Sequence, residues 1–152
     1  MRLALYEPDI PQNTGTIIRL SACMNLGLDI IEPCGFPFSI KALRRSAMDY
    51  ADIADVTTHE SWGAFRQKVE ENQTRLVLLT TKTTNSYLDF NFRKSDTLLF
   101  GRESAGVPDD VADFAHEKLT IPMAEGTRSL NIAVSAAMVV GEAIRQTRYS
   151  NS

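Results

Sequence analysis

The stretch TRLVLLTT, residues 74–81, is the strongest strand signal in the chain. Its centre, Leu76–Leu79, is a continuous apolar run that does not alternate with polar residues. A run of this kind is typical of a strand that is buried on both faces, as in a parallel sheet covered by helices. The stretch therefore favours an α/β fold built around a parallel sheet.

The segments around this strand alternate between strand-like and helix-like patterns. Further strands are predicted at Arg2–Tyr6, Leu28–Pro33, Ala54–His59, Asp96–Gly101 and Lys118–Pro122. Helices are predicted at about Thr14–Leu26, around Lys41–Met48, over Glu60–Gln73, from Pro108, and at about Ser129–Gln146. The alternation predicts a Rossmann-like parallel sheet with helices on both faces.

Ligands of such folds bind beyond the carboxyl ends of the strands. We therefore expect the chemistry of this protein in the loops that follow the predicted strands. These loops are Glu7–Asn13, Thr80–Thr84, Gly101–Pro108 and Pro122–Ser129.

Length and composition narrow the class of protein. A chain of 152 residues is predicted to form one domain, residues 1–152, and no stretch approaches the length of a membrane-spanning helix. Two cysteines make neither a disulfide framework nor a metal-ligand spacing, and two histidines argue against a histidine-rich metal centre, so no metal is expected. These features predict a reduced, cytoplasmic protein. The net charge of −3 argues against a general nucleic-acid coat but allows a local basic face.

The segment PQNTGTIIRL, residues 11–20, follows the first predicted strand. Asn13 and Thr14 suit the N-cap of the next helix. Arg19 lies near that helix N-terminus, which already favours anions, and could bind a phosphate bidentately. The alternative for Arg19 is a surface ion pair with Glu7 or Glu103.

The segment FGRESAGVP, residues 100–108, places Gly101 where a ligand could approach the backbone. The carboxylate of Glu103 could orient a polar ligand or an arginine. A hydrolase with Ser104 as nucleophile and His116 as base is an alternative, but the glycine spacing differs from that of a nucleophile elbow.

The segment IPMAEGTRSLN, residues 121–131, leads into the last helix. Ser129 is predicted to be its N-cap and Asn131 to fall in its first turn. The middle of that helix, IAVSAAMVVG, is apolar almost all the way round, which predicts burial on more than one side and makes a subunit interface a natural second partner.

The segment KALRRSAMDY, residues 41–50, carries the densest positive charge in the chain. Lys41, Arg44 and Arg45 have the spacing of one helix face, and Tyr50 could stack on a base. A solvated charged face and an RNA-binding surface are both open interpretations.

Taken in order, these segments together with IIEPCGF and LTTK resemble the three motifs of the SPOUT class of RNA methyltransferases. The match is to the small tRNA 2′-O-methyltransferases that modify the wobble nucleotide, and it extends from Leu5 to Gln146. The resemblance implies an α/β fold with a deep C-terminal trefoil knot, although chains as a rule avoid knots. It also implies a homodimer packed partly through the last helix, with tRNA as substrate.

The resemblance further implies S-adenosylmethionine as methyl donor, S-adenosylhomocysteine as product, and no metal. Carried over residue by residue, the donor site falls on Leu79, Thr80, Gly101, Ile121, Met123, Ser129 and Leu130. The catalytic set falls on Asn13, Arg19, Glu103, Ser129 and Asn131, and RNA binding is expected at Lys41, Arg44, Arg45 and Tyr50.

Arg19 is the base that the resemblance implies, although arginine stays protonated in proteins. A bound substrate phosphate could orient it, or it could stabilise the developing alkoxide. The expected activity is 2′-O-methylation of a cytidine or modified uridine at position 34. A catalytically silent RNA-binding dimer and a methyltransferase acting on another RNA site are the alternatives.

Overall fold

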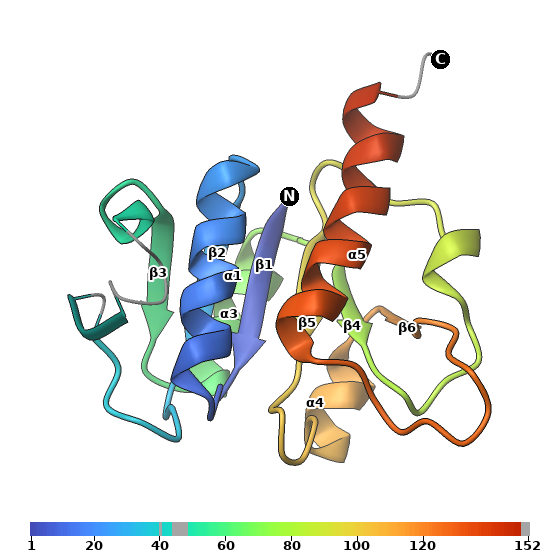
Figure 1. The fold of residues 1–152 in the computed structure, drawn as a ribbon, viewed down its shortest axis with the longest axis horizontal. Coiled ribbons are helices and arrows are strands. Elements are labelled where there is room, and N and C mark those ends of the chain that lie inside the picture. The colour runs from blue at the N-terminus through green and yellow to red at the C-terminus, as the bar shows by residue number, and fades with distance from the viewer. Residues whose placement is uncertain (40, 44–48, 150–152) are drawn as a thin grey trace.

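Residues 1–39, 41–43 and 49–149, which the computed structural model describes, form a sheet of six parallel strands (Figure 1). The strands are β1 (Arg2–Tyr6), β2 (Gly27–Ile31), β3 (Asp55–His59), β4 (Leu76–Leu79), β5 (Thr97–Phe100) and β6 (Glu117–Leu119). They lie in the order β3-β2-β1-β5-β4-β6. All the predicted strands are confirmed, with ends that differ by a few residues.

The central strands are buried on both faces, as the apolar run of β4 predicted. Successive residues of a strand point to opposite faces of the sheet. On β1, Leu3 and Leu5 therefore belong to the core on one face, while Ala4 and Tyr6 belong to the core on the other. The parallel α/β class follows directly from this two-sided burial.

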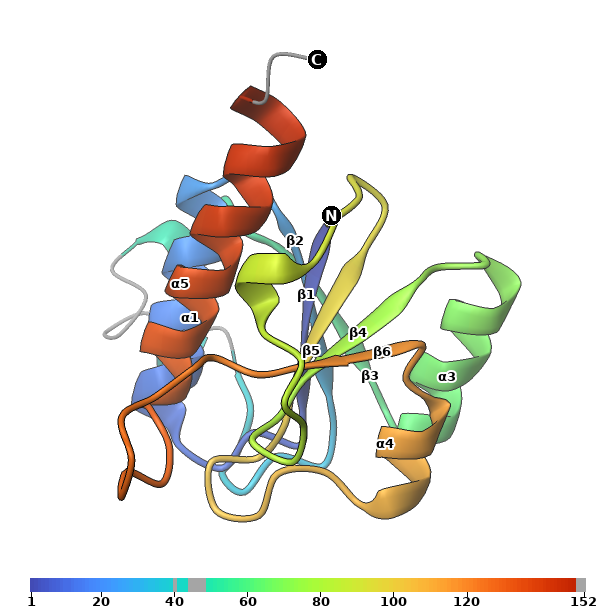
Figure 2. The ribbon, with the colours of Figure 1, turned by 90° about the vertical axis from the view of Figure 1, so that its right-hand side faces the viewer.

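Helices cover both faces of the sheet (Figure 2). On one face lie α1 (Pro11–Cys23) and α5 (Ile132–Ile144), and on the other lie α3 (Trp62–Glu71) and α4 (Asp109–Phe114). Single turns of 3-10 helix occupy Tyr50–Asp52 and Tyr87–Asp89, and a π-helical turn at Arg145–Tyr149 continues α5. The helix predicted around Lys41–Met48 is helical at residues 41–43, and residues 44–48 lie outside the described residues.

The predicted N-caps of α1 and α5 were both wrong. Helix α1 begins at Pro11 with Ile10 as N-cap, so Asn13 and Thr14 lie inside its first turn. The reason is that proline is well suited to the first helical position, because its missing N–H is not needed there. The N-cap of α5 is Asn131 and not Ser129; its side chain accepts hydrogen bonds from the N–H groups of Ala133 and Val134.

Helix α5 has a buried face and an exposed apolar face. Ala136, Val139, Val140 and Ala143 are almost fully buried against the sheet and α1. Val134 and Met138 lie one turn apart and keep 48% and 40% of their surface exposed, and Leu130 just before the helix keeps 40%. The predicted burial on more than one side is therefore not complete within one protomer.

Candidate active site

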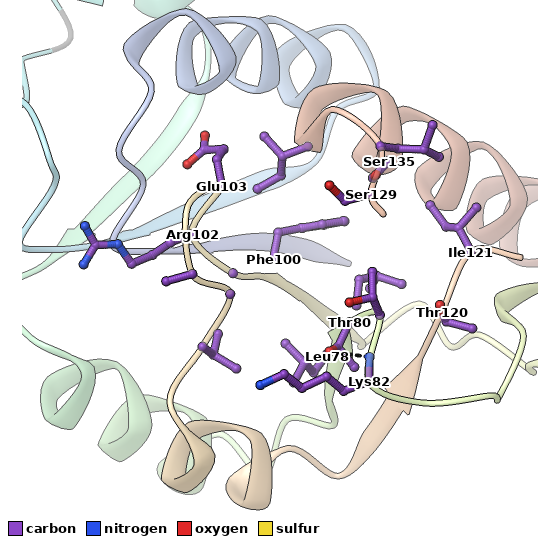
Figure 3. Close-up of a pocket in the computed structure, with 18 of the residues that line it drawn as sticks. Leu78, Thr80, Lys82, Phe100, Arg102, Glu103, Thr120, Ile121, Ser129 and Ser135 are labelled. Carbon is purple, nitrogen blue, oxygen red and sulfur yellow. Dashed lines mark hydrogen bonds between the residues drawn. The ribbon is translucent and has the colours of Figure 1, made fainter. Parts of the chain in front are cut away.

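A pocket of about 670 Å³ opens at the carboxyl ends of β4, β5 and β6 (Figure 3). Its walls come from the loops that follow these strands and from the start of α5. All seven residues predicted for the methyl donor line it, namely Leu79, Thr80, Gly101, Ile121, Met123, Ser129 and Leu130. The pocket thus lies where the carboxyl-end rule for parallel sheets places a ligand.

The back of the pocket is fixed by main-chain hydrogen bonds around the end of β6. The N–H of Thr80 donates to the carbonyl of Leu119 at 2.8 Å, and the N–H of Thr120 donates to the carbonyl of Asn85 at 2.8 Å. The N–H of Tyr87 donates in turn to the carbonyl of Thr120 at 3.0 Å. The chain leaving β6 therefore lies beside residues 80–87.

The loop after β5 turns tightly on itself. The main chains of Arg102 and Gly106 exchange two hydrogen bonds of 2.9 and 2.8 Å, and Gly106 has a φ of +65°. A Cβ added at Gly101 would lie 2.7 Å from the carbonyl carbon of Gly106. Gly101 was predicted to let a ligand approach the backbone. In the structure, a side chain at Gly101 would instead clash with this turn.

Two of the predicted catalytic residues form a direct contact between α1 and α5. The side-chain amide of Asn131 donates to Oδ1 of Asn13 at 3.0 Å, while its own Oδ1 caps α5. Both asparagines line the pocket. This hydrogen bond links the first and last helices at the rim of the site.

Of the five predicted catalytic residues, Asn13, Glu103, Ser129 and Asn131 line the pocket. Arg19 is not among the lining residues; it lies farther along α1 and is exposed. Its guanidinium carbon is 5.3 Å from the centre of the Tyr50 ring, a cation–π distance. Tyr50, predicted to stack on a base, therefore stacks on Arg19 in this structure.

The predicted basic face is described in part. Lys41 is exposed, and Arg44 and Arg45 lie outside the described residues. Glu7, one of the two acidic partners suggested for Arg19, pairs with Arg102 at 3.4 Å.

Sequence reasoning missed Asp9 and Arg102 as neighbours of the site. The N–H of Asp9 donates to Oε2 of Glu103 at 3.1 Å, and Arg102 Nε lies 3.8 Å from Asp9 Oδ2. Asp9 was in a loop already marked for chemistry. What the sequence lacked was the pairing of β1 with β5, which brings that loop beside Glu103.

The hydrolase alternative is contradicted by the positions of its two key residues. Ser104 donates its hydroxyl to Asp9 at the carboxyl edge of the sheet. His116 accepts a hydrogen bond from the N–H of Leu76 at 3.0 Å, at the amino end of β4. A nucleophile and its base must lie within hydrogen-bond reach, and these two lie at opposite edges.

Residues 1–39, 41–43 and 49–149 contain no group of three or more histidine, cysteine or acidic side chains that could hold a metal ion. Within the same residues no helix is both long and apolar enough to cross a membrane.

An α/β protein with a small-molecule pocket at the carboxyl edge of its parallel sheet is the class that this fold and site define. Residues 1–141 match the model of the SpoU rRNA Methylase family. The chain belongs to this family.

Similar proteins extend the comparison over nearly the whole chain. A protein of Beijerinckia indica named tRNA (cytidine(34)-2′-O)-methyltransferase is 54% identical over 144 residues, which cover 95% of this chain and 90% of the relative. A solved structure described as giving insights into the 2-OH methylation of C/U34 on tRNA superposes with a TM-score of 0.89 at 37% identity, covering 95% of this chain and 94% of that one.

A third similarity concerns the methyl donor. The SpoU methyltransferase AviRb of Streptomyces viridochromogenes, solved in complex with the cofactor AdoMet, superposes with a TM-score of 0.87 at 26% identity. The match covers 96% of this chain and 60% of that one.

Proposed function

We propose that this protein transfers a methyl group from S-adenosylmethionine to the ribose 2′-hydroxyl of nucleotide 34, a cytidine or modified uridine, in tRNA. The observation that carries the proposal is the 54% identity, over 95% of this chain, to a relative named for this reaction. The pocket and its polar rim supply a site in which the reaction can occur. The whole of residues 1–152 acts as one methyltransferase domain, in the cytoplasm where tRNA is used.

The residues present fit the methyl donor. Apolar side chains of Leu79, Ile121 and Leu130 offer packing for a base, while Thr80 and Ser129 bring hydroxyl groups to the same walls. The volume of about 670 Å³ is within the roughly 300–1,000 Å³ of typical small-molecule sites. S-adenosylmethionine bound there would supply a methyl group activated by its sulfonium.

The polar rim would orient the ribose. The Asn13–Asn131 contact fixes two amide groups at the mouth of the pocket, and Ser129 lies beside them on the pocket wall. Positioning of this kind can supply much of the rate of a transfer between two bound groups. Arginine stays protonated in proteins, so Arg19 would not take the proton itself but would bind a substrate phosphate and stabilise the alkoxide that develops as the hydroxyl releases its proton to solvent.

The donor site is proposed to lie in a trefoil knot. The main chains of Thr80, Asn85 and Tyr87 hydrogen-bond the chain leaving β6. The side chain of Gln146, just past α5, accepts from the N–H of Phe92 and donates to the carbonyl of Phe90 at 2.9 Å each. These contacts support a C-terminal segment that passes through the loop between β4 and β5.

A homodimer is proposed through the exposed face of α5. Leu130, Val134 and Met138 present an apolar stripe beside the pocket, and a second copy would bury it. We expect a sedimentation mass near twice the 16.9 kDa of one chain at assay concentration. Val134→Asp should convert the dimer to monomer, whereas a wild-type protein that is already monomeric would contradict the proposal.

The decisive experiment uses purified protein, tritiated S-adenosylmethionine and bulk tRNA, followed by nucleoside analysis. We expect label in the ribose at position 34 and none in a tRNA that carries a 2′-deoxynucleotide there. Donor binding without transfer to any RNA would favour the catalytically silent RNA-binding dimer. Label at another nucleotide would favour a methyltransferase acting on a different RNA site.

RNA binding is proposed to involve Lys41, Arg44, Arg45 and Tyr50. Lys41→Ala combined with Arg44→Ala should weaken tRNA binding and lower the slope of log K against log salt by about 1 for each lost phosphate contact. Fluorescence anisotropy at several salt concentrations measures both. Arg93→Ala with Lys94→Ala, just before β5 at the opposite edge of the sheet, is the matched control. An unchanged slope in the Lys41→Ala, Arg44→Ala variant would mean that these two residues form a solvated charged face and do not contact the RNA.

A further inference from the structure

The loops after β1 and β5 are joined by a cluster of carboxyl groups beside the pocket. Strands β1 and β5 are paired as far as Leu5 and Phe100, so the residues that follow them are neighbours. The N–H of Asp9 donates to Oε2 of Glu103 at 3.1 Å, and the hydroxyl of Ser104 donates to Oδ2 of Asp9. Figure 3 shows the Glu103 carboxyl group turned away from Phe100 and from Ser129.

The carboxyl groups of Asp9 and Glu103 lie close enough for a hydrogen bond between them to shift the pKa of both groups. Two ionised carboxylates are acceptors only, so such a contact requires that one of them carry a proton. Oδ1 of Asp9 is buried and has no hydrogen-bond partner among the described residues. A proton on Glu103 would provide the donor that the buried Oδ1 of Asp9 lacks.

The charges around the pair favour one negative charge over two. Burial and then the negative charges of Glu32, Glu7 and Glu103 raise the pKa of the nearby Cys34 thiol to about 11. These three carboxyl groups therefore lie near one another. Arg102 faces the pair, with its Nε 3.8 Å from Oδ2 of Asp9, and it is also paired with Glu7. A second carboxylate charge would therefore add to the acidic groups that Arg102 already faces.

Burial and the hydrogen bond to Asp9 raise the pKa of Glu103. The same hydrogen bond lowers the pKa of Asp9, with further help from Ser104 and Arg102. The two shifts have the opposite signs expected when neighbouring carboxyl groups share one proton.

We propose that Asp9 is a positioning residue of the transfer site, which holds Glu103 through one shared proton and through its own main-chain N–H. The shared proton ties the loop before α1 to the loop after β5, so that the two loops form one fixed wall of the pocket. It also leaves the pair with a single negative charge, partly balanced by Arg102, where a polyanionic substrate must approach. The role rests on the proposed function; the shared proton does not.

Carbon-13 NMR of the side-chain carboxyl carbons tests the shared proton without any substrate. In the wild-type protein, we expect Glu103 to titrate above the ordinary range of glutamate. In Asp9→Asn it should return toward that range, because the neighbouring negative charge is gone. An ordinary titration of Glu103 in the wild type, or one that Asp9→Asn leaves unchanged, would overturn the proposal.

Stability against pH gives a second test that does not depend on activity. A raised pKa in the folded state contributes stability at low pH that is lost as pH rises through that pKa. Glu103→Gln replaces the acidic proton by an amide N–H that stays in place, so the loss of stability as pH rises through the Glu103 pKa should shrink in this variant. An equal loss in Glu103→Gln and wild type would count against the shared proton.

The positioning role is tested by the kinetics of methyl transfer. Asp9→Ala should lower kcat about tenfold with a smaller change in KM for tRNA, because the pocket wall loses its fixed geometry. In Asp9→Asn any fall of kcat that accompanies ionisation of Glu103 should move to lower pH, and Asp9→Glu should restore part of the rate lost in Asp9→Ala. Asp110→Asn, an exposed residue of α4 outside the pocket lining, is the matched control.

The outcomes separate the two proposals. Normal kcat and an unmoved pH profile in the Asp9 variants, in a wild-type protein that methylates tRNA, would refute the positioning role alone. A wild-type protein that transfers no methyl group, yet shows the raised Glu103 titration, would refute the proposed function and leave the shared proton standing.

Discussion

Arg19→Ala is expected to lower kcat for methyl transfer by about 10²-fold or more, since a charged donor that stabilises developing negative charge is typically worth that much. Binding of S-adenosylmethionine should change little, because Arg19 does not line the pocket. Single-turnover methylation of tRNA measures the first quantity, and calorimetric titration with the donor measures the second.

The matched control for this variant is Arg66→Ala. Arg66 on α3 is also an exposed arginine over an aromatic ring, with its guanidinium carbon 4.6 Å from the centre of Phe114. It lies on the face of the sheet opposite α1 and should leave turnover unchanged. Near-normal turnover in Arg19→Ala would remove Arg19 from the mechanism.

The distance of Arg19 from the pocket of its own chain raises the question of which subunit it serves. Mixing Arg19→Ala protein with Ser129→Ala protein answers it if the protein forms the proposed homodimer. If Arg19 completes the partner's site, mixed dimers contain one site with both residues and recover activity. If it serves its own chain, both sites of the mixed dimer stay damaged and no activity returns.

The elements of the fold that local patterns specify could be predicted from the sequence. The apolar run Leu76–Leu79 has no polar alternation, and the structure buries its residues on alternate faces of the sheet. The same logic placed the ligand pocket at the strand ends, because that rule depends only on the parallel class. The helix starts were harder, since Pro11 and Asn13, or Ser129 and Asn131, are competing start signals a few residues apart.

What the sequence could not supply is contact between residues far apart along the chain. Asn131 caps α5 in preference to Ser129 in a geometry that also lets it bond Asn13, 118 residues away. Asp9 lies beside Glu103 because β1 pairs with β5 and not with β4. Neither pairing leaves a periodic trace in the sequence.

A second large effect is expected on stability, at a buried carboxylate far from the pocket. Asp29 in the middle of β2 is 2% exposed, accepts from Arg2 Nε at 2.6 Å and contacts His59 Nε2 at 2.7 Å. Lys68 of α3 adds a third contact at 3.3 Å. Three strands and one helix are therefore joined through one side chain.

Asp29→Asn should lower the free energy of unfolding by about 3 kcal/mol, because removal of one partner leaves the others without their counter-charge in a buried site. This value is at the low end of the range of about 3–5 kcal/mol for such changes. The reason is that the Arg2 side chain is 29% exposed and retains its ion pair with Asp55 at 2.8 Å. Urea unfolding measures it. Asp113→Asn is the matched control, since its 80% exposed side chain pairs with Lys118 only at 3.8 Å.

The decrease of the free energy of unfolding in acid provides a second test of the same variant. Burial raises the pKa of Asp29, but the hydrogen bonds from Arg2 and His59 outweigh it, so the pKa is lowered overall. A lowered pKa contributes stability that is present above the unfolded-state value and is lost as pH falls through the folded-state value. The wild-type protein should therefore lose stability in acid more steeply than Asp29→Asn, which has no carboxylate to protonate. Parallel acid limbs, or a loss below about 1 kcal/mol at neutral pH, would mean that Asp29 is held by packing and not by its charge.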